Sequence, residues 1–250
     1  MTDADAAPCS VGVVVVAAGS GSRLGAALPK AFVPLGGRPL LGHALDTVAR
    51  LAHVAAVVVV VPPGLDDTSA PPWAGVDLPP HAVVVAGGAS RTESVSAGLA
   101  AVGDVDVVLV HDAARCLTPL EVFERVVAAV AAGAAGAVPG IPVVDTVKTV
   151  DSLGVITGTP ERASLRAVQT PQGFVREVLV AAHASGVGAT DDAALVELGG
   201  HRVLVVEGDP LAFKVTTADD LDRAERVLAQ RAGATGASGA VGAVGPGLRH

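Results

Sequence analysis

The sequence has little aromatic surface and few sulfur-containing residues. Its 250 residues include four Phe, one Trp, no Tyr, one Met and two Cys. Half of the residues are hydrophobic, so the core is expected to consist mainly of Ala, Val and Leu. The scarcity of aromatic side chains argues against a nucleic-acid site in which successive bases stack on exposed rings.

A surplus of basic residues is also missing. The chain has 17 Lys and Arg against 25 Asp and Glu, which gives a formal net charge of −8. Such a surface repels a nucleic-acid backbone, and we expect no nucleic-acid partner. A small anionic ligand is a different case, because a few local cations decide the field that it meets.

Signals for disulfides, export and membrane insertion are absent or weak. Cys9 and Cys116 fit neither a CxxC nor a zinc spacing, and we expect a reduced pair in a cytoplasmic protein. The N-terminus is acidic, unlike the basic start of a secretory signal. Residues 126–144 carry no charge over a length that could span a bilayer, but they contain several Gly and Pro. We expect a helix end, a turn and a buried strand there, and no membrane partner.

Short aliphatic runs alternate with amphipathic segments along the first half of the chain. The pattern predicts strands at 11–17, 54–61, 82–86 and 105–111, and helices at 39–51, 90–102 and 119–132. Buried aliphatic strands separated by helices indicate an α/β, Rossmann-like fold, with a mostly parallel sheet covered by helices on both faces. Ligands of such sheets bind at the carboxyl ends of the strands.

The pattern changes after the strand expected at 137–144. Polar and apolar residues then alternate around a Ser-Leu-Gly turn, which predicts a projecting β-hairpin arm at about 145–170. Further segments are predicted as a return at 166–169, helices at 175–184, from 190 and from 216 or 217, and strands at 202–206 and 213–216. The expected organisation is an N-terminal tail (1–10), one domain (11–231) and a flexible Gly/Ala tail (232–250).

A glycine-rich loop follows the first predicted strand. It contains Gly19 and Gly21, then Arg23 and, beyond Pro29, Lys30. Backbone N–H groups of such a loop can surround a polyphosphate while two cations reach the same charge. Neither the dinucleotide-binding nor the Walker pattern fits the loop. A plain strand-to-helix turn is the alternative, although a turn requires neither cation.

Six further motifs follow this loop in order. They are Gly87-Gly88-Ala89-Ser90-Arg91-Thr92-Glu93-Ser94-Val95, His111-Asp112-Ala113-Ala114-Arg115, Asp145-Thr146-Val147-Lys148, Gln169-Thr170-Pro171-Gln172, Thr190-Asp191-Asp192 and Lys214-Val215-Thr216. Together with the loop, over about residues 11–228, the set resembles the 2-C-methyl-D-erythritol 4-phosphate cytidylyltransferase family of nucleotidyltransferases.

The resemblance implies a reaction. CMP would pass from CTP to 2-C-methyl-D-erythritol 4-phosphate, giving 4-CDP-2-C-methyl-D-erythritol and pyrophosphate in non-mevalonate isoprenoid biosynthesis. Negative charge builds on the α-phosphate and on the leaving pyrophosphate, so the site must position and stabilise charge and needs no protein nucleophile. The implied cofactor is Mg²⁺, held mainly by the CTP phosphates with Asp112 as a candidate ligand.

The resemblance also implies roles for individual residues. The catalytic cations would be Arg23, Lys30, Arg162 and Lys214, of which Arg162 and Lys214 would grip the substrate phosphate. The nucleotide would be bound by Ala17, Ala18, Gly19, Gly21, Gly87, Gly88 and Ser94. The second substrate would be bound by Asp112, Arg115, Thr146, Thr170 and Thr190.

In the family the arm crosses to a partner subunit. A homodimer through the arm is therefore expected, with Arg162 and Thr146 completing the neighbour's site. Without the resemblance, these residues have simpler interpretations. Arg162 would be a solvated surface charge, Ser94 would be a residue on a helix surface, and Asp112 and Arg115 would form an internal ion pair. His111 is expected to bond locally, because a phosphate nucleophile needs no base.

The chain departs from the family pattern at three positions. Val16 and Cys116 stand where proline is common, and Ala89 stands where an acidic residue is common. The first two departures should alter loop stiffness, and the third removes one polar contact to the nucleotide.

Two alternative functions stay open at this point. One is a cytidylyltransferase for another polyol phosphate, such as ribitol 5-phosphate. The other is a non-catalytic nucleotide-binding regulator. The presence of Arg23, Lys30, Arg162 and Lys214 together argues against it, because a protein that only binds a nucleotide would not require all four.

Overall fold

A computed structural model describes residues 9–19, 21, 28–69 and 72–238 of the chain, with the backbone alone for 232–238. An eight-stranded sheet forms its centre, in the order β10-β7-β11-β6-β1-β4-β5, with β12 also paired to β7. The strands are β1 (Val11–Val16), β4 (Val54–Val61), β5 (Ala82–Ala86), β6 (Val107–Asp112), β7 (Gly136–Pro142), β10 (Arg166–Val168), β11 (Gln172–Val175) and β12 (Val203–Glu207).

Most of the sheet is parallel, as the aliphatic runs predict. The pairs β1–β4, β1–β6, β4–β5 and β7–β12 are parallel, whereas β11 runs antiparallel to both of its neighbours, β6 and β7. The parallel strands β1 and β6 end side by side, where Val16 is in register with Asp112. The glycine-rich loop and the His111–Arg115 motif therefore leave the sheet at the same edge.

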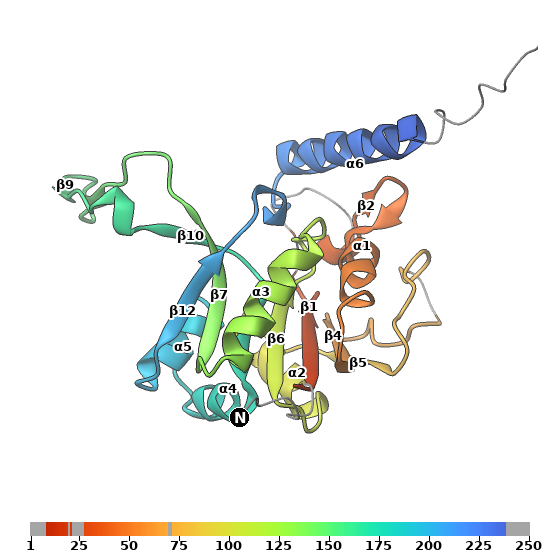
Figure 1. Ribbon diagram of the computed structural model, residues 1–250, viewed down its shortest axis with the longest axis horizontal. Helices are drawn as coiled ribbons and strands as arrows, with labels where there is room; N and C mark the ends of the chain where they lie inside the picture. The colour runs from red at the N-terminus through yellow and green to blue at the C-terminus, as the bar shows by residue number, and fades with distance from the viewer. Residues whose placement is uncertain (1–8, 20, 22–27, 70–71, 239–250) are drawn as a thin grey trace, which may run out of the picture.

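Helices cover both faces of the sheet (Figure 1). One face carries α1 (Leu40–Val48) and α3 (Leu120–Ala131). The other carries α2 (Arg91–Ala101), α4 (Arg176–Ala184) and α5 (Asp192–Leu198). Alternate residues of β1 therefore pack in opposite directions, Val13 towards the first set of helices and Val14 towards the second.

A third layer lies beyond the carboxyl edge of the sheet. Helix α6 (Ala218–Ser238) crosses above it in Figure 1, close to the short hairpin of β2 (Pro34–Leu35) and β3 (Arg38–Pro39). The contact is partly polar, because the Gly36 N–H donates to Glu225 Oε1 at 2.8 Å.

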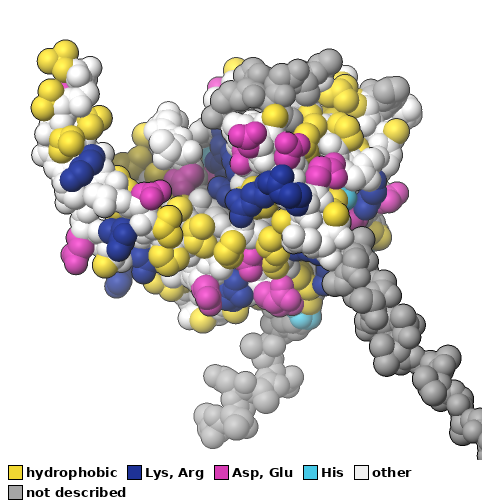
Figure 2. Space-filling model, turned by 90° about the horizontal axis from the view of Figure 1, so that it is seen from above, with side chains coloured by type: hydrophobic (Ala, Val, Ile, Leu, Met, Phe, Trp, Pro, Cys, Tyr) yellow, Lys and Arg dark blue, Asp and Glu magenta, His cyan; other side chains and the backbone are white. Residues whose placement is uncertain are grey.

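The predicted arm projects from the body between β7 and β10 (Figures 1 and 2). It contains the hairpin strands β8 (Thr149–Val150) and β9 (Ile156–Gly158) and the 3-10 helix η3 (Arg162–Ser164). Hydrophobic side chains stand exposed along the arm, among them Val144, Leu153 and Val155. Such a surface is typical of an interaction site.

Some predictions about the elements were wrong. The segment at 213–216, which was expected to be a strand, follows the 3-10 helix η4 (Pro210–Ala212) without joining a sheet, although the Val215 N–H donates to the Ala114 carbonyl at 2.9 Å. The flexible tail was predicted from residue 232, but α6 continues to Ser238, and residues 239–250 lie outside the described part. Strand β11 was not predicted, because it is short and contains Gln172 and Gly173.

The uncharged stretch 126–144 forms the end of α3, a turn and β7, as expected. Gly133 makes the turn with a φ of 103°, a left-handed conformation that favours glycine. Within the described residues, no helix combines the length and the apolar character needed to cross a membrane.

Candidate active site

A cavity of about 420 Å³ opens at the carboxyl ends of β1 and β6. Its walls come from the glycine-rich loop, the 3-10 helix η2 (Lys30–Phe32), the turn before α2, the end of β6 and the segment after η4. Predicted site residues that line it are Ala17, Ala18, Gly19, Lys30, Gly88, Ser94, Asp112 and Lys214. Motifs far apart in the sequence therefore meet at the edge where ligands of such sheets bind.

The glycine-rich loop brings Lys30 back to the end of β1. The Lys30 N–H donates to the Gly19 carbonyl at 3.3 Å, and Lys30 Nζ lies 3.3 Å from Thr216 Oγ1. Gly21 has a φ of 69°, and a Cβ there would lie 2.6 Å from the Cβ of Lys30. Only glycine permits this close return. Arg23, the second predicted cation of the loop, lies outside the described residues.

The turn before α2 is fixed by its own side chains. Ser90 caps the helix by accepting the Glu93 N–H at 3.1 Å, and Glu93 accepts the N–H of Ala89, the residue before the cap, at 3.0 Å, an arrangement related to the capping box. Ser94 is buried, with 3 % of its surface exposed, so it is not the surface residue of the alternative interpretation. Its hydroxyl donates to the Ser90 carbonyl at 2.9 Å and accepts the Gly88 N–H at 3.2 Å. Ser94 thus shapes the Gly87–Gly88 turn from behind.

Asp112 is the carboxylate of the cavity, at the end of β6. Its Oδ2 lies 2.7 Å from Lys214 Nζ, and its Oδ1 lies 3.5 Å from Arg91 Nε. Burial alone would raise the pKa of Asp112, but the charge of Lys214, followed by that of Arg91, lowers this pKa to about 2. Asp112 is therefore ionised at neutral pH and holds two cations at the cavity wall.

Thr170 and His111 support Asp112 from the interior. Thr170 Oγ1 accepts the Asp112 N–H at 3.0 Å and pairs with His111 Nδ1 at 3.1 Å. Thr170 is buried, so its visible role is to hold the end of β6. Burial lowers the pKa of His111 to about 4. His111 is buried and bonded to Thr170, and it is not among the described residues that line the cavity, so it bonds locally.

Arg115 does not form the internal ion pair with Asp112 that was one alternative; within the described residues its guanidinium contacts carbonyl oxygens instead. It donates to the Ala212 carbonyl at 2.7 Å and to the Val168 carbonyl at 3.3 Å. Arg115 therefore ties the return of the arm to the segment that carries Lys214. Cys116, at one of the departures from the family pattern, is buried in the apolar cluster beneath α6.

The remaining predicted residues lie outside the cavity wall. Thr146 and Arg162 belong to the arm, where Arg162 donates to the Val144 carbonyl at 2.8 Å. Thr190 is exposed in the loop before α5 and lines a neighbouring hollow. Gly87 lies directly behind the turn, where an added Cβ would lie 2.7 Å from Ser94 Oγ.

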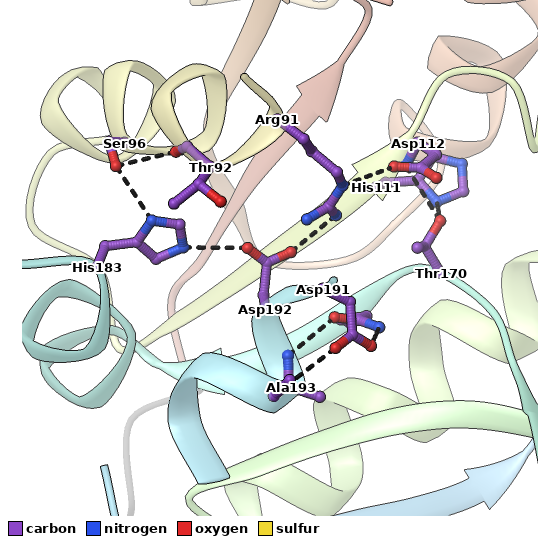
Figure 3. A network of polar contacts seen from close by, with 12 residues as sticks. Arg91, Thr92, Ser96, His111, Asp112, Thr170, His183, Asp191, Asp192 and Ala193 are labelled. Carbon is purple, nitrogen blue, oxygen red and sulfur yellow. Dashed lines mark hydrogen bonds and ion pairs between the residues drawn. The ribbon is translucent and has the colours of Figure 1, made fainter. Parts of the chain in front are cut away.

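Sequence reasoning missed the partners of Arg91. Its guanidinium lies between two carboxylates, with Nη2 at 2.8 Å from Asp192 Oδ2 (Figure 3). Arg91 and Asp192 both stand within the quoted motifs, but nothing in their spacing indicates that they meet. The neighbouring Asp191 caps α5 by accepting the Ala194 N–H at 3.0 Å.

The cavity offers the carboxylate of Asp112 to a metal ion that arrives with a phosphate ligand. Within the described part of the chain, no group of three or more His, Cys, Asp and Glu could hold a metal ion. Mg²⁺ often uses one or two protein carboxylates together with substrate phosphates and waters. Asp112 can supply one such carboxylate, because it is ionised and lines the cavity.

Comparisons with known proteins agree with this arrangement. The family model for IspD, 2-C-methyl-D-erythritol 4-phosphate cytidylyltransferase, matches residues 11–230. A curated protein of that name from Nocardia farcinica is 53% identical over 234 residues, which cover 93% of this chain and 99% of that protein.

Solved structures give the same result. The crystal structure of the 2-C-methyl-D-erythritol 4-phosphate cytidylyltransferase from Thermus thermophilus aligns with a TM-score of 0.71 and 38% identity over 87% of this chain and 98% of that one. The 4-diphosphocytidyl-2C-methyl-D-erythritol synthase from Anaerococcus prevotii aligns with a TM-score of 0.77 and 26% identity over 88% and 96%. The matched span contains the loop, the cavity and the arm, and the chain belongs to the 2-C-methyl-D-erythritol 4-phosphate cytidylyltransferase family.

Proposed function

We propose that the cavity around Asp112 is the site at which this chain transfers CMP from CTP to 2-C-methyl-D-erythritol 4-phosphate. The observation that carries the proposal is the convergence of Lys30, Arg91 and Lys214 on one cavity, where Asp112 is the only carboxylate among the described lining residues. Two anionic substrates must approach each other here, and this excess of positive charge lowers the cost of bringing them together.

The glycine-rich loop and the turn before α2 form the nucleotide half of the proposed site. The N–H groups of Gly87, Gly88 and Ala89 are paired within the protein, with Val61 O, Ser94 Oγ and Glu93 Oε2. This turn therefore meets a base through carbonyl oxygens, which suit the amino group of cytosine. Lys30 and Arg23 would face the triphosphate.

The chemical step needs no covalent intermediate with the protein. An oxygen of the substrate phosphate attacks the α-phosphorus of CTP, and the bond from that phosphorus to the bridging oxygen of the β-phosphate breaks, releasing pyrophosphate. Lys30 stabilises the charge that builds on the nucleotide phosphates, and Lys214 orients the attacking phosphate. Mg²⁺, held by the CTP phosphates with Asp112 as a protein ligand, would neutralise part of the same charge.

The arm supplies the remaining part of the proposal. Its exposed apolar residues and its distance from the body favour a cytoplasmic homodimer in which Arg162 and Thr146 of one subunit reach the cavity of the other. Arginine suits a phosphate because it binds in a bidentate manner. The free thiols of Cys9 and Cys116 fit a reducing compartment.

Pyrophosphate release tests the function directly. The protein is mixed with Mg²⁺, one of four nucleoside triphosphates, and either 2-C-methyl-D-erythritol 4-phosphate or ribitol 5-phosphate. We expect release only with CTP and the methylerythritol phosphate. Selective release with ribitol 5-phosphate would replace the proposed substrate, and binding of CTP without release in any combination would leave only a nucleotide-binding protein.

A further inference from the structure

A buried carboxylate connects the cavity to helix α4 on the outer layer. Asp192 is fully buried at the start of α5, and its two oxygens face two different side chains. Oδ2 forms the ion pair with Arg91, and Oδ1 lies 3.0 Å from His183 Nε2 (Figure 3). With the carboxylate oxygen of Asp192 as the acceptor, the Nε2 of His183 is the donor in this contact.

His183 is itself held in a fixed orientation. Its side chain is only 4% exposed, and its Nδ1 pairs with Ser96 Oγ at 3.1 Å. The hydroxyl of Ser96 also lies 3.0 Å from the Thr92 carbonyl, one turn back in α2. Both ring nitrogens therefore have partners on elements other than α4, and the imidazole joins α2 to α5.

Arg91 carries this connection into the cavity. Its Nη2 faces Asp192, while its Nε faces Asp112, and the residue lines the cavity wall. A guanidinium placed between two carboxylates shifts towards whichever is better fixed. The position of Arg91 thus depends on how firmly the carboxylate of Asp192 is held, and His183 is the side chain that holds its other oxygen.

We propose that His183 is a positioning residue that acts through Asp192 to fix Arg91, and thereby the Asp112–Lys214 pair, in the geometry needed for transfer. The proposal rests on the proposed function of the cavity. His183 itself touches no substrate. Without its N–H, the carboxylate of Asp192 is held less firmly, and Arg91 shifts towards Asp112 and disturbs the pairing of Asp112 with Lys214.

The start of α5 has separate supports, which makes the role of His183 testable. Gln172 donates to Asp191 Oδ2 at 2.8 Å and accepts the Ala193 N–H at 3.2 Å. Replacing His183 therefore leaves these backbone and capping contacts in place, and the helix keeps its start.

Two substitutions separate the two nitrogens of the ring. The amide nitrogen of His183→Gln occupies roughly the place of Nε2 and can donate to Asp192, whereas that of His183→Asn corresponds to Nδ1 and reaches only towards Ser96. We expect His183→Asn to lower kcat about tenfold, the factor for one hydrogen bond of ordinary strength, and His183→Gln to stay within about threefold of the parent. KM for CTP should change less than about twofold in both.

Non-additivity is the decisive readout, because a general loss of stability would not produce it. In an Arg91→Gln background, His183→Asn should have no further effect on kcat, since the group through which it acts is gone. Rates are measured per folded protein, with circular dichroism and melting temperature as checks. His43→Gln is the matched control, because His43 is a part-buried histidine that bonds the Leu35 carbonyl away from the cavity.

Equal effects of the Asn and Gln variants, or a full tenfold effect of His183→Asn in the Arg91→Gln background, would overturn the proposal. Lys30→Ala separates this failure from failure of the proposed function. If Lys30→Ala loses activity while His183→Asn does not, the cavity is catalytic and only the role of His183 is wrong. If Lys30→Ala is fully active, the proposed function of the cavity is wrong.

Discussion

Lys214 Nζ and Asp112 Oδ2 lie 2.7 Å apart although 102 positions separate the two residues in the chain. Lys214 follows η4, whereas Asp112 ends the strand next to β1 at the centre of the sheet. The pair therefore forms only when the last part of the domain has packed onto the first. Within one subunit, this part of the cavity wall therefore depends on long-range packing and not on a local motif.

Removing the charge of Lys214 should disable the chemical step. We expect Lys214→Met to lower kcat/KM for 2-C-methyl-D-erythritol 4-phosphate about 100- to 1000-fold, because a preorganised cation facing the reacting phosphate is lost. Steady-state pyrophosphate release measures the effect. Arg223→Met is the control, since Arg223 packs over the ring of Phe213 beside the same segment without lining the cavity. Comparable losses in both variants would contradict the prediction.

Ser94→Ala should weaken nucleotide binding and leave the chemistry intact. The substitution removes the acceptor of the Gly88 N–H and the hydroxyl that bonds the Ser90 carbonyl, so the turn loses its internal support. We expect KM for CTP to rise about three- to tenfold with kcat within about twofold. Ser185→Ala, which removes a hydroxyl bonded to the Ala182 carbonyl at the end of α4, should change neither constant. A fall in kcat alone would place Ser94 in the chemical step.

Stability should decrease as the pH falls below about 6.5, because of His111. Burial lowers its pKa to about 4 in the folded protein, so the unfolded chain takes up the proton first as the pH falls. The contribution is fully present above the ordinary pKa of histidine and is lost progressively down to about pH 4, by roughly 3 kcal/mol in all. Urea unfolding at several pH values measures it.

His111→Asn provides the comparison for this pH dependence. Its amide can take the place of Nδ1 beside Thr170, and it does not titrate in this range. The free energy of unfolding of the variant should fall less steeply between pH 6.5 and 4 than that of the parent. Parallel curves would assign the pH dependence to other groups. The carboxylate of Asp112 contributes in a lower window, because its folded pKa of about 2 lies below its ordinary value and its stabilisation is lost below pH 4.

Mixed dimers test whether the arm completes a neighbour's site. Arg162→Ala removes the proposed contribution in trans, and Lys30→Ala removes one in cis, so each variant alone should be nearly inactive. After the two are unfolded and refolded together, random pairing should restore about a quarter of the parent activity, because half of the dimers then contain one intact site of two. Recovery no greater than the sum of the separate variants would contradict the shared site.

The sequence predicts those parts of the molecule that local pattern determines. The valine runs of β1 and β4 can be read directly because both faces of a parallel sheet are buried there, whereas β5 is a partly exposed edge strand. The Ser90 cap likewise marks the start of α2. The position of β11 was missed because it depends on pairing with β6 and β7, far away in sequence.

The same distinction applies to the cavity. Lys30, Asp112 and Lys214 were predicted through their motifs, and they line one cavity. The ion pair of Arg91 with Asp192 was not predicted, because the spacing of motifs in the sequence does not show which side chains face each other in the fold. The expected role of Arg115 at the substrate stays a prediction, and its contacts with two carbonyl oxygens could not be read from the motif.

The arm is braced along its length. At its base β10 pairs with β7, ending where Arg166 is in register with Pro142. Further out, Arg162 donates to the Val144 carbonyl, and Lys148 Nζ lies 2.7 Å from Thr159 Oγ1. Because these contacts occur at several points along its length, the arm is a rigid extension of the sheet and not a flexible tether. If two subunits exchange such arms, each arm links the sheet of its own subunit to the cavity of the other. The distance and the angle between the two cavities are then fixed by the orientation of the two sheets.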